Sequence, residues 1–153
     1  MLKIGEKIPT LSGTVTDGST FKLAAAKGQW LVLYFYPKDS TPGCTREAQD
    51  FRDLHAEFAR RNAMVVGVSR DSPKSHANFT AKQNLPFPLI ADTDETWCTA
   101  FDVIHEKMLY GKVHLGVVRS TFLVDPHGKL AAQWRGVKVP GHAQAVLDTI
   151  PAA

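Results

Sequence analysis

The stretch that decides the fold is Trp30-Leu31-Val32-Leu33-Tyr34-Phe35-Tyr36, which runs directly into Pro37-Lys38-Asp39-Ser40-Thr41-Pro42-Gly43-Cys44-Thr45. An unbroken run of aromatic and aliphatic residues predicts a strand that is buried on both faces. Two prolines and a glycine then end the strand, and a cysteine stands where a new helix is expected to begin. Because a helix start presents free N–H groups and the positive end of the helix dipole, a thiol there is shifted toward thiolate, its reactive form. The stretch therefore predicts a nucleophile at the end of a central strand.

Strands and helices alternate outward from this stretch. We expect a β-hairpin over residues 13–23 with its turn at Asp17-Gly18. We expect strands over residues 30–36, 64–69, 89–91, 119–125 and 130–135. We expect helices over residues 44–62, from 71 to before Pro86, from a cap at 92–94 to Ile104, and over 142–150. Alternation implies parallel pairing, and the tight turn at 126–129 adds antiparallel edge strands. The pattern predicts an α/β fold with a mixed central sheet, helices on both faces and an N-terminal hairpin. No linker is visible, so we expect one domain over residues 1–153.

Composition and charge point to a globular protein of ordinary type. Hydrophobic residues make up 44% and charged residues 22% of the chain, and the longest apolar run is far shorter than the ~20 residues that span a bilayer. The N-terminus has no apolar stretch of signal-peptide length, so we expect a cytoplasmic protein without a membrane partner. The net charge is +3 with no Lys/Arg-rich run, which argues against a nucleic-acid partner.

The two cysteines, Cys44 and Cys98, form no C-x-x-C pair. A thioredoxin-type dithiol and a zinc knuckle are therefore excluded, and a reducing compartment argues against a permanent disulfide. The chain is left with a single reactive thiol, or with two thiols that meet only through the fold. The six histidines are scattered without metal-ligand spacing, so we expect no metal and no cofactor.

Pro37, Thr41 and Cys44 match the Pro-x-x-x-Thr-x-x-Cys signature of peroxiredoxins, which are thiol peroxidases on a thioredoxin-like fold. The run from Phe35 to Thr45 closely resembles the bacterioferritin comigratory protein branch, also called the Q-type. The resemblance extends to Gly5-x-x-x-Pro9, to Val66 through Ser72 and to Arg119 through Asp125. It implies a thioredoxin-like fold and an enzyme that reduces hydrogen peroxide and organic hydroperoxides through a sulfenate on its peroxidatic cysteine.

The resemblance also implies roles for the residues around Cys44. A peroxide O–O bond breaks when a thiolate attacks one oxygen and the other oxygen leaves with negative charge, so the site needs hydrogen-bond donors and a cation. Thr41 is implied to hydrogen-bond the peroxide and the thiolate, Pro37 to shield the pocket from water, and Arg119 to place a permanent cation beside the sulfur. The alternatives are that Thr41 is a plain helix cap and that Arg119 is an ordinary surface residue.

Two further residues near Cys44 are expected to support the site. Gly43 belongs to the same strand-to-helix turn. Glu47 lies one helical turn after Cys44, at a position that commonly pairs with an arginine in the family; alternatively, its carboxylate simply suits the helix dipole.

The role of Cys98 is open between a packed core thiol and a resolving cysteine that condenses with the sulfenate. Many members of the branch carry a resolving cysteine five residues after the peroxidatic one, where this chain has Gln49, and others carry it on the next helix, where residues 75–84 contain none. The resemblance therefore implies a monomeric enzyme with a one-cysteine mechanism and an external reductant: thioredoxin, glutaredoxin or glutathione. The alternatives are a peroxide-sensing relay protein and a two-cysteine peroxidase that uses Cys98. A cysteine phosphatase is excluded, because Cys-x5-Arg would require an arginine where Asp50 stands.

Overall fold

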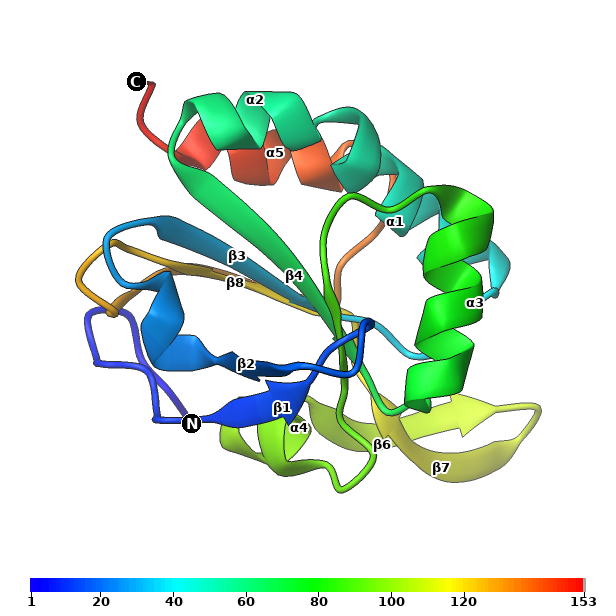
Figure 1. Cartoon of the computed structure of the whole chain (residues 1–153). Helices are drawn as coiled ribbons and strands as arrows, with labels where there is room; N and C mark the ends of the chain where they lie inside the picture. Colours follow the sequence, from blue (N-terminus) through cyan, green and yellow to red (C-terminus); the bar gives the residue numbers. More distant parts are fainter. Residues whose placement is uncertain (153) are drawn as a thin grey trace.

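The computed structural model describes residues 1–152, and a five-stranded mixed sheet lies at its centre (Figure 1). The strand order is β5-β4-β3-β8-β9, with β3 (Trp30–Phe35), β4 (Ala63–Ser69), β5 (Leu89–Ala91), β8 (Ser120–Val124) and β9 (Leu130–Arg135). β3, β4 and β5 are parallel, whereas β8 runs antiparallel to both β3 and β9. The predicted mixed sheet is confirmed, and the apolar run at 30–36 forms its central strand because only a strand covered on both faces buries every side chain.

Successive side chains of β3 point to opposite faces of the sheet and so supply two separate cores. Val32 and Tyr34 belong to the helix-side core, which is covered by α1 (Pro42–Asp53), α2 (His55–Arg60), α3 (Pro73–Gln83) and α5 (His142–Thr149). Leu31, Leu33 and Phe35 belong to the hairpin-side core, which is covered by α4 (Thr96–Ala100), a 3-10 helix (Leu23–Ala26) and the N-terminal hairpin. Figure 1 shows α1, α2 and α5 on one side of the sheet and β1, β2 and α4 on the other.

The predicted N-terminal hairpin is confirmed. Its strands, β1 (Ser12–Thr14) and β2 (Thr20–Lys22), pair antiparallel. The turn between them has Gly18 at φ +85°, a left-handed conformation that glycine adopts without steric cost, and the Asp17 carboxylate accepts the N–H of Ser19.

Two predicted helices differ from the structure. The helix expected over residues 44–62 is wrong in extent: α1 begins at Pro42, where the missing N–H of proline costs no hydrogen bond, and it gives way to α2 at Leu54. The helix expected to hold Ile104 ends at Ala100 instead. Its predicted cap is confirmed, because the Asp92 carboxylate accepts the N–H groups of Trp97 and Cys98.

Ile104 begins a hairpin that we did not expect, formed by β6 (Ile104–Leu109) and β7 (Lys112–Val117). Most of its side chains are exposed, and its strands pair only with each other. A two-stranded hairpin that buries neither face does not need alternating apolar and polar residues. The search for such alternation therefore did not predict this hairpin. Within residues 1–152, every helix is too short or too polar to span a lipid bilayer.

Candidate active site

Cys44 lies in the first turn of α1, directly beyond the loop that leaves the carboxyl end of β3. Thr41 occupies the N-cap position and Pro42 the first helical position, so the local sequence starts the helix just before the cysteine. The Cys44 side chain is buried in the helix-side core. Its sulfur therefore lies near the positive end of α1, where an anion is stabilised.

Arg119 reaches Cys44 because of how β3 and β8 pair. Phe35, at the end of β3, is opposite Ser120, at the start of β8, so residue 119 lies beside the loop that leads to α1. Arg119 Nη2 donates to Cys44 Sγ at 3.5 Å, and Nη1 donates to Glu47 Oε1 at 2.7 Å. Burial lowers the pKa of Arg119, but the nearby Glu47 carboxylate and Cys44 sulfur outweigh it and raise that pKa above its ordinary value.

Glu47 is buried beneath Arg119. Burial raises the pKa of Glu47 from 4.5 to about 7, although Arg119 pulls it the other way. One carboxylate oxygen accepts from Arg119, and the other, Oε2, is buried without a hydrogen-bond partner among residues 1–152. A carboxylate that only complements a helix dipole would stay in water, so the geometry fits the pairing with arginine better.

Gly43 is the residue that lets the guanidinium approach α1. A Cβ atom at this position would lie 3.2 Å from Arg119 Nη2, which is tighter than ordinary van der Waals contact. A side chain at this position would require the guanidinium to shift by a few tenths of an ångström.

Thr41 and Pro37 lie in the loop before α1, and both are half-buried. The Thr41 hydroxyl does not cap the helix; it donates to the carbonyl oxygen of Lys38 at 2.8 Å. Because its hydrogen is committed to that carbonyl, the remaining lone pairs of the hydroxyl are available to accept a hydrogen bond from a substrate.

Cys98 lies in the hairpin-side core, so the central sheet separates it from Cys44 in the helix-side core. It is fully buried, and burial raises the pKa of Cys98 far above its ordinary value. Gln49 stands where many members of the branch carry a resolving cysteine, and its side chain donates to Gln83 on α3 at 3.0 Å. The structure brings Cys44, Glu47, Gly43 and Arg119 together and leaves Cys98 apart.

Sequence reasoning missed one group beside the loop between β3 and α1, which we call the catalytic loop: the buried Asp39 and His76 and the half-buried Asp71. Asp39 follows β3 and Asp71 follows β4, two parallel strands whose carboxyl ends meet at one edge of the sheet. Acidic residues four and two positions after the ends of two neighbouring parallel strands were the available signal. His76 carried no such signal, because it looked like one scattered histidine among six.

The chain is similar to known proteins over most of its length. A sequence model of the AhpC/TSA family matches residues 4–133. The chain is 56% identical over 139 residues to peroxiredoxin Bcp of Xanthomonas campestris, covering 91% of this chain and 87% of that one. It is 48% identical over 149 residues to peroxiredoxin Bcp of Bacillus subtilis, covering 97% and 95%.

Solved structures give the same result. A bacterioferritin comigratory protein from Xanthomonas campestris, studied for its alkyl peroxide reduction activity, superposes with a TM-score of 0.88 at 55% identity over 92% of this chain and 89% of that one. A cysteine variant of Xylella fastidiosa PrxQ superposes with a TM-score of 0.92 at 45% identity over 97% and 94%. This chain therefore belongs to the AhpC/TSA family and is a peroxiredoxin of the Bcp type, a thiol-dependent peroxidase with a thioredoxin-like fold.

Proposed function

We propose that Cys44 is the peroxidatic cysteine and that it reduces hydrogen peroxide and organic hydroperoxides by a one-cysteine mechanism. The observation that carries this proposal is the guanidinium of Arg119, which bridges Cys44 Sγ and the buried Glu47 carboxylate. The thiolate sulfur forms a bond to one peroxide oxygen while the O–O bond breaks. The sulfur becomes a sulfenic acid, and the other oxygen takes a proton and leaves as water or an alcohol.

Each proposed residue acts on one part of this step. Arg119 stabilises the thiolate and then the negative charge on the leaving oxygen, and Glu47 holds its guanidinium in place. Thr41 accepts the peroxide O–H with the lone pairs that its bond to Lys38 leaves free. Pro37 screens the site from water, and Gly43 makes room for the guanidinium.

The one-cysteine mechanism is supported by the separation of the two cysteines. A disulfide needs Cα atoms within about 7 Å of each other. Cys98 and Cys44 are packed on opposite faces of the central sheet, so the whole thickness of the sheet lies between them. The sulfenate then condenses with an external thiol, releasing water and forming a mixed disulfide that a further thiol reduces.

Thioredoxin, glutaredoxin or glutathione supplies that thiol in this proposal. We also propose that the protein is a monomer in the cytoplasm. Residues 1–153 are proposed to form one domain, of which residue 153 lies outside the described residues. The two free cysteines suit such a reducing compartment.

The test is peroxide consumption over many turnovers with each of the three thiol reductants. We expect the parent to turn over repeatedly and Cys44→Ser to consume no peroxide. Substantial turnover by Cys44→Ser would overturn the assignment of the nucleophile. Consumption of a single equivalent of peroxide with every reductant would favour a sensing role over the enzyme.

A further inference from the structure

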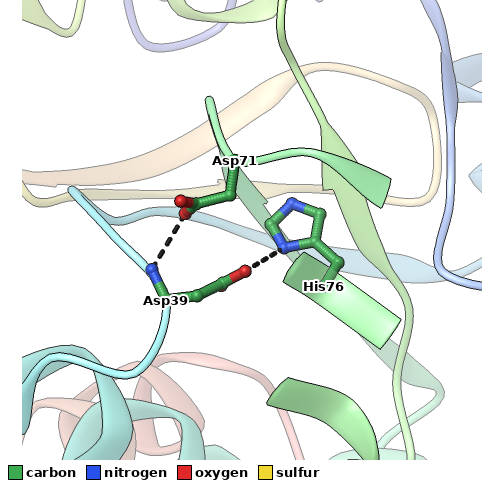
Figure 2. A group of neighbouring side chains, drawn as sticks. All are labelled: Asp39, Asp71 and His76. Atoms are coloured by element: carbon green, nitrogen blue, oxygen red, sulfur yellow. Dashed lines mark hydrogen bonds and ion pairs between the residues drawn. The ribbon is translucent and has the colours of Figure 1, made fainter. Parts of the chain in front are cut away.

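Asp39, Asp71 and His76 meet beside the catalytic loop, although they come from three separate segments (Figure 2). Asp39 lies in the loop between β3 and α1, Asp71 follows β4, and His76 lies in α3. Asp39 and His76 are buried, and Asp71 is half-buried. Figure 2 shows the backbone nitrogen of Asp39 directed toward Asp71 and its side chain directed toward His76.

The Asp39 carboxylate has all its partners within the protein. It accepts hydrogen bonds from Tyr36 Oη at 2.6 Å and from Ser75 Oγ at 2.8 Å, and it lies 2.7 Å from His76 Nδ1. The other ring nitrogen, Nε2, lies 3.0 Å from the carbonyl oxygen of Ile90. Because Tyr36, Ser75 and His76 already occupy the Asp39 oxygens, a metal ion would have to displace these internal contacts, and the group is a structural clamp rather than an ion site.

The clamp also holds the backbone of Asp39. The Asp39 N–H donates to Asp71 Oδ2 at 2.8 Å, and the same carboxylate oxygen accepts from Ser69 Oγ at 2.6 Å. The N–H of Asp39 and the carbonyl of Lys38 belong to one peptide group, which is planar and trans. Fixing the N–H by Asp71 therefore also fixes the direction of the Lys38 carbonyl.

That carbonyl is the acceptor for the Thr41 hydroxyl, at 2.8 Å. One rigid peptide group thus connects Asp71 on one side to Thr41 on the other. The Asp39 side chain, held by His76 and Ser75 from α3, prevents the peptide from turning.

We infer that Asp39, Asp71 and His76 are positioning residues for the peroxidase reaction, because they hold the Lys38–Asp39 peptide group in the orientation that aims the Thr41 lone pairs at the peroxide. The inference rests on the proposed role of Thr41 as a peroxide ligand. When the clamp is broken, the peptide group turns and the Thr41 hydroxyl loses its fixed direction. The thiol, which is held by α1 and Arg119, remains in place.

The test compares two second-order rates of Cys44, one with hydrogen peroxide and one with iodoacetamide. Alkylation needs only an accessible thiolate, whereas peroxide reduction also needs the aimed hydroxyl. The ratio of the two rates therefore reports the positioning of Thr41, and a general loss of stability does not change it. Thermal unfolding of each variant is recorded beside the rates.

Two pairs of variants isolate the clamp. Asp71→Ala removes the acceptor of the Asp39 N–H, whereas Asp71→Asn keeps an amide oxygen in its place. His76→Gln loses the ring nitrogen beside Asp39 and keeps an amide near the position of Nε2, whereas His76→Asn keeps an amide near the position of Nδ1. We expect Asp71→Ala and His76→Gln to lower the ratio by roughly 10-fold or more, the scale of a misplaced catalytic group, and their partners to stay within about threefold of the parent.

Thr41→Val separates this inference from the proposed function. If Thr41→Val lowers the ratio and Asp71→Ala and His76→Gln do not, the clamp does not position Thr41 and the inference is overturned. Equal losses in Asp71→Ala and Asp71→Asn would also overturn it, because the bond to the Asp39 N–H would then be irrelevant. If Thr41→Val itself leaves the ratio unchanged, the proposed role of Thr41 fails, and the inference fails with it.

Discussion

At the scale of single residues, the central feature of the proposed site is the guanidinium of Arg119, which contacts two other side chains. Arg119 contacts Cys44 Sγ with one nitrogen and Glu47 with another, which the planar fork of an arginine allows. The spacing of these residues shows neither contact, because they are 72 and 75 positions apart; the resemblance to peroxiredoxins is what implied both.

Arg119→Lys tests the fork separately from the charge. A lysine ammonium is a point charge and cannot hold Glu47 and the sulfur in the same geometry. We expect the rate of Cys44 oxidation, measured by stopped flow, to fall by about 100-fold, the scale seen when one electrostatic donor is removed. Arg46→Lys, at an exposed position on α1, is the matched control and should leave the rate unchanged. A rate within about twofold of the parent would remove Arg119 from the site.

Glu47 predicts a specific dependence of stability on pH. Its pKa is about 7 in the folded protein and 4.5 as its ordinary value, because burial disfavours the charged carboxylate. The folded state therefore binds more protons than the unfolded state between these values. The stability contributed by Glu47 is fully present below pH 4.5 and is lost as the pH rises through 7.

Urea unfolding of the parent and of Glu47→Gln over this pH range measures the effect. The free energy of unfolding of the parent should fall relative to that of Glu47→Gln, by on the order of 3 kcal/mol across the window. A constant difference between the two proteins at all pH values would show that Glu47 does not titrate abnormally.

At the scale of elements, the first turn of α1 combines a poor helix former with a close approach of Arg119. Gly43 is an unfavourable residue within a helix, yet a Cβ there would lie 3.2 Å from the Arg119 guanidinium. The turn therefore keeps a glycine where alanine would form a better helix.

Gly43→Ala should separate the two properties. Helix propensity favours alanine by up to about 1 kcal/mol, so the free energy of unfolding should not decrease. The added methyl group displaces Arg119, so the rate of peroxide reduction should fall by about 10-fold, as expected for a misplaced donor. A variant that keeps the parent rate would show that the guanidinium has room to adjust.

At the scale of the whole molecule, the central sheet divides the interior into two cores. Cys44 lies in the helix-side core and Cys98 lies in the hairpin-side core. The strands of the sheet lie between the two thiols, so a disulfide would require packed elements to move. In the structure Cys98 is a buried core residue.

Intact-mass analysis after one equivalent of peroxide tests this separation. The parent should gain about 16 Da as Cys44 sulfenate, which dimedone traps, and excess peroxide should drive it to sulfinate. Cys98→Ala should give the same mass changes and keep turnover with an external thiol within about twofold. A loss of about 2 Da in the parent, together with lost turnover in Cys98→Ala, would show a Cys44–Cys98 disulfide and a two-cysteine enzyme.

Much of the fold could be predicted because its signals are local. The apolar run at 30–36, the turn at Asp17-Gly18 and the cap at Asp92 each act within a few residues, and all three are present in the structure. The break at Leu54 and the hairpin over residues 104–117 were missed, because neither changes the apolar periodicity.

The sequence by itself determined the central strand, a helix start next to Cys44 and the peroxiredoxin signature, since each is written in consecutive residues. The tertiary structure decided how residues far apart in the chain reach the site. Arg119 arrives through the pairing of β3 with β8, and the Asp39–His76 clamp arrives through the packing of α3 against the catalytic loop. The separation of Cys44 from Cys98 was likewise decided by the fold, because the face of a sheet to which a side chain points depends on strand register and packing, and these are set by contacts far apart in the chain.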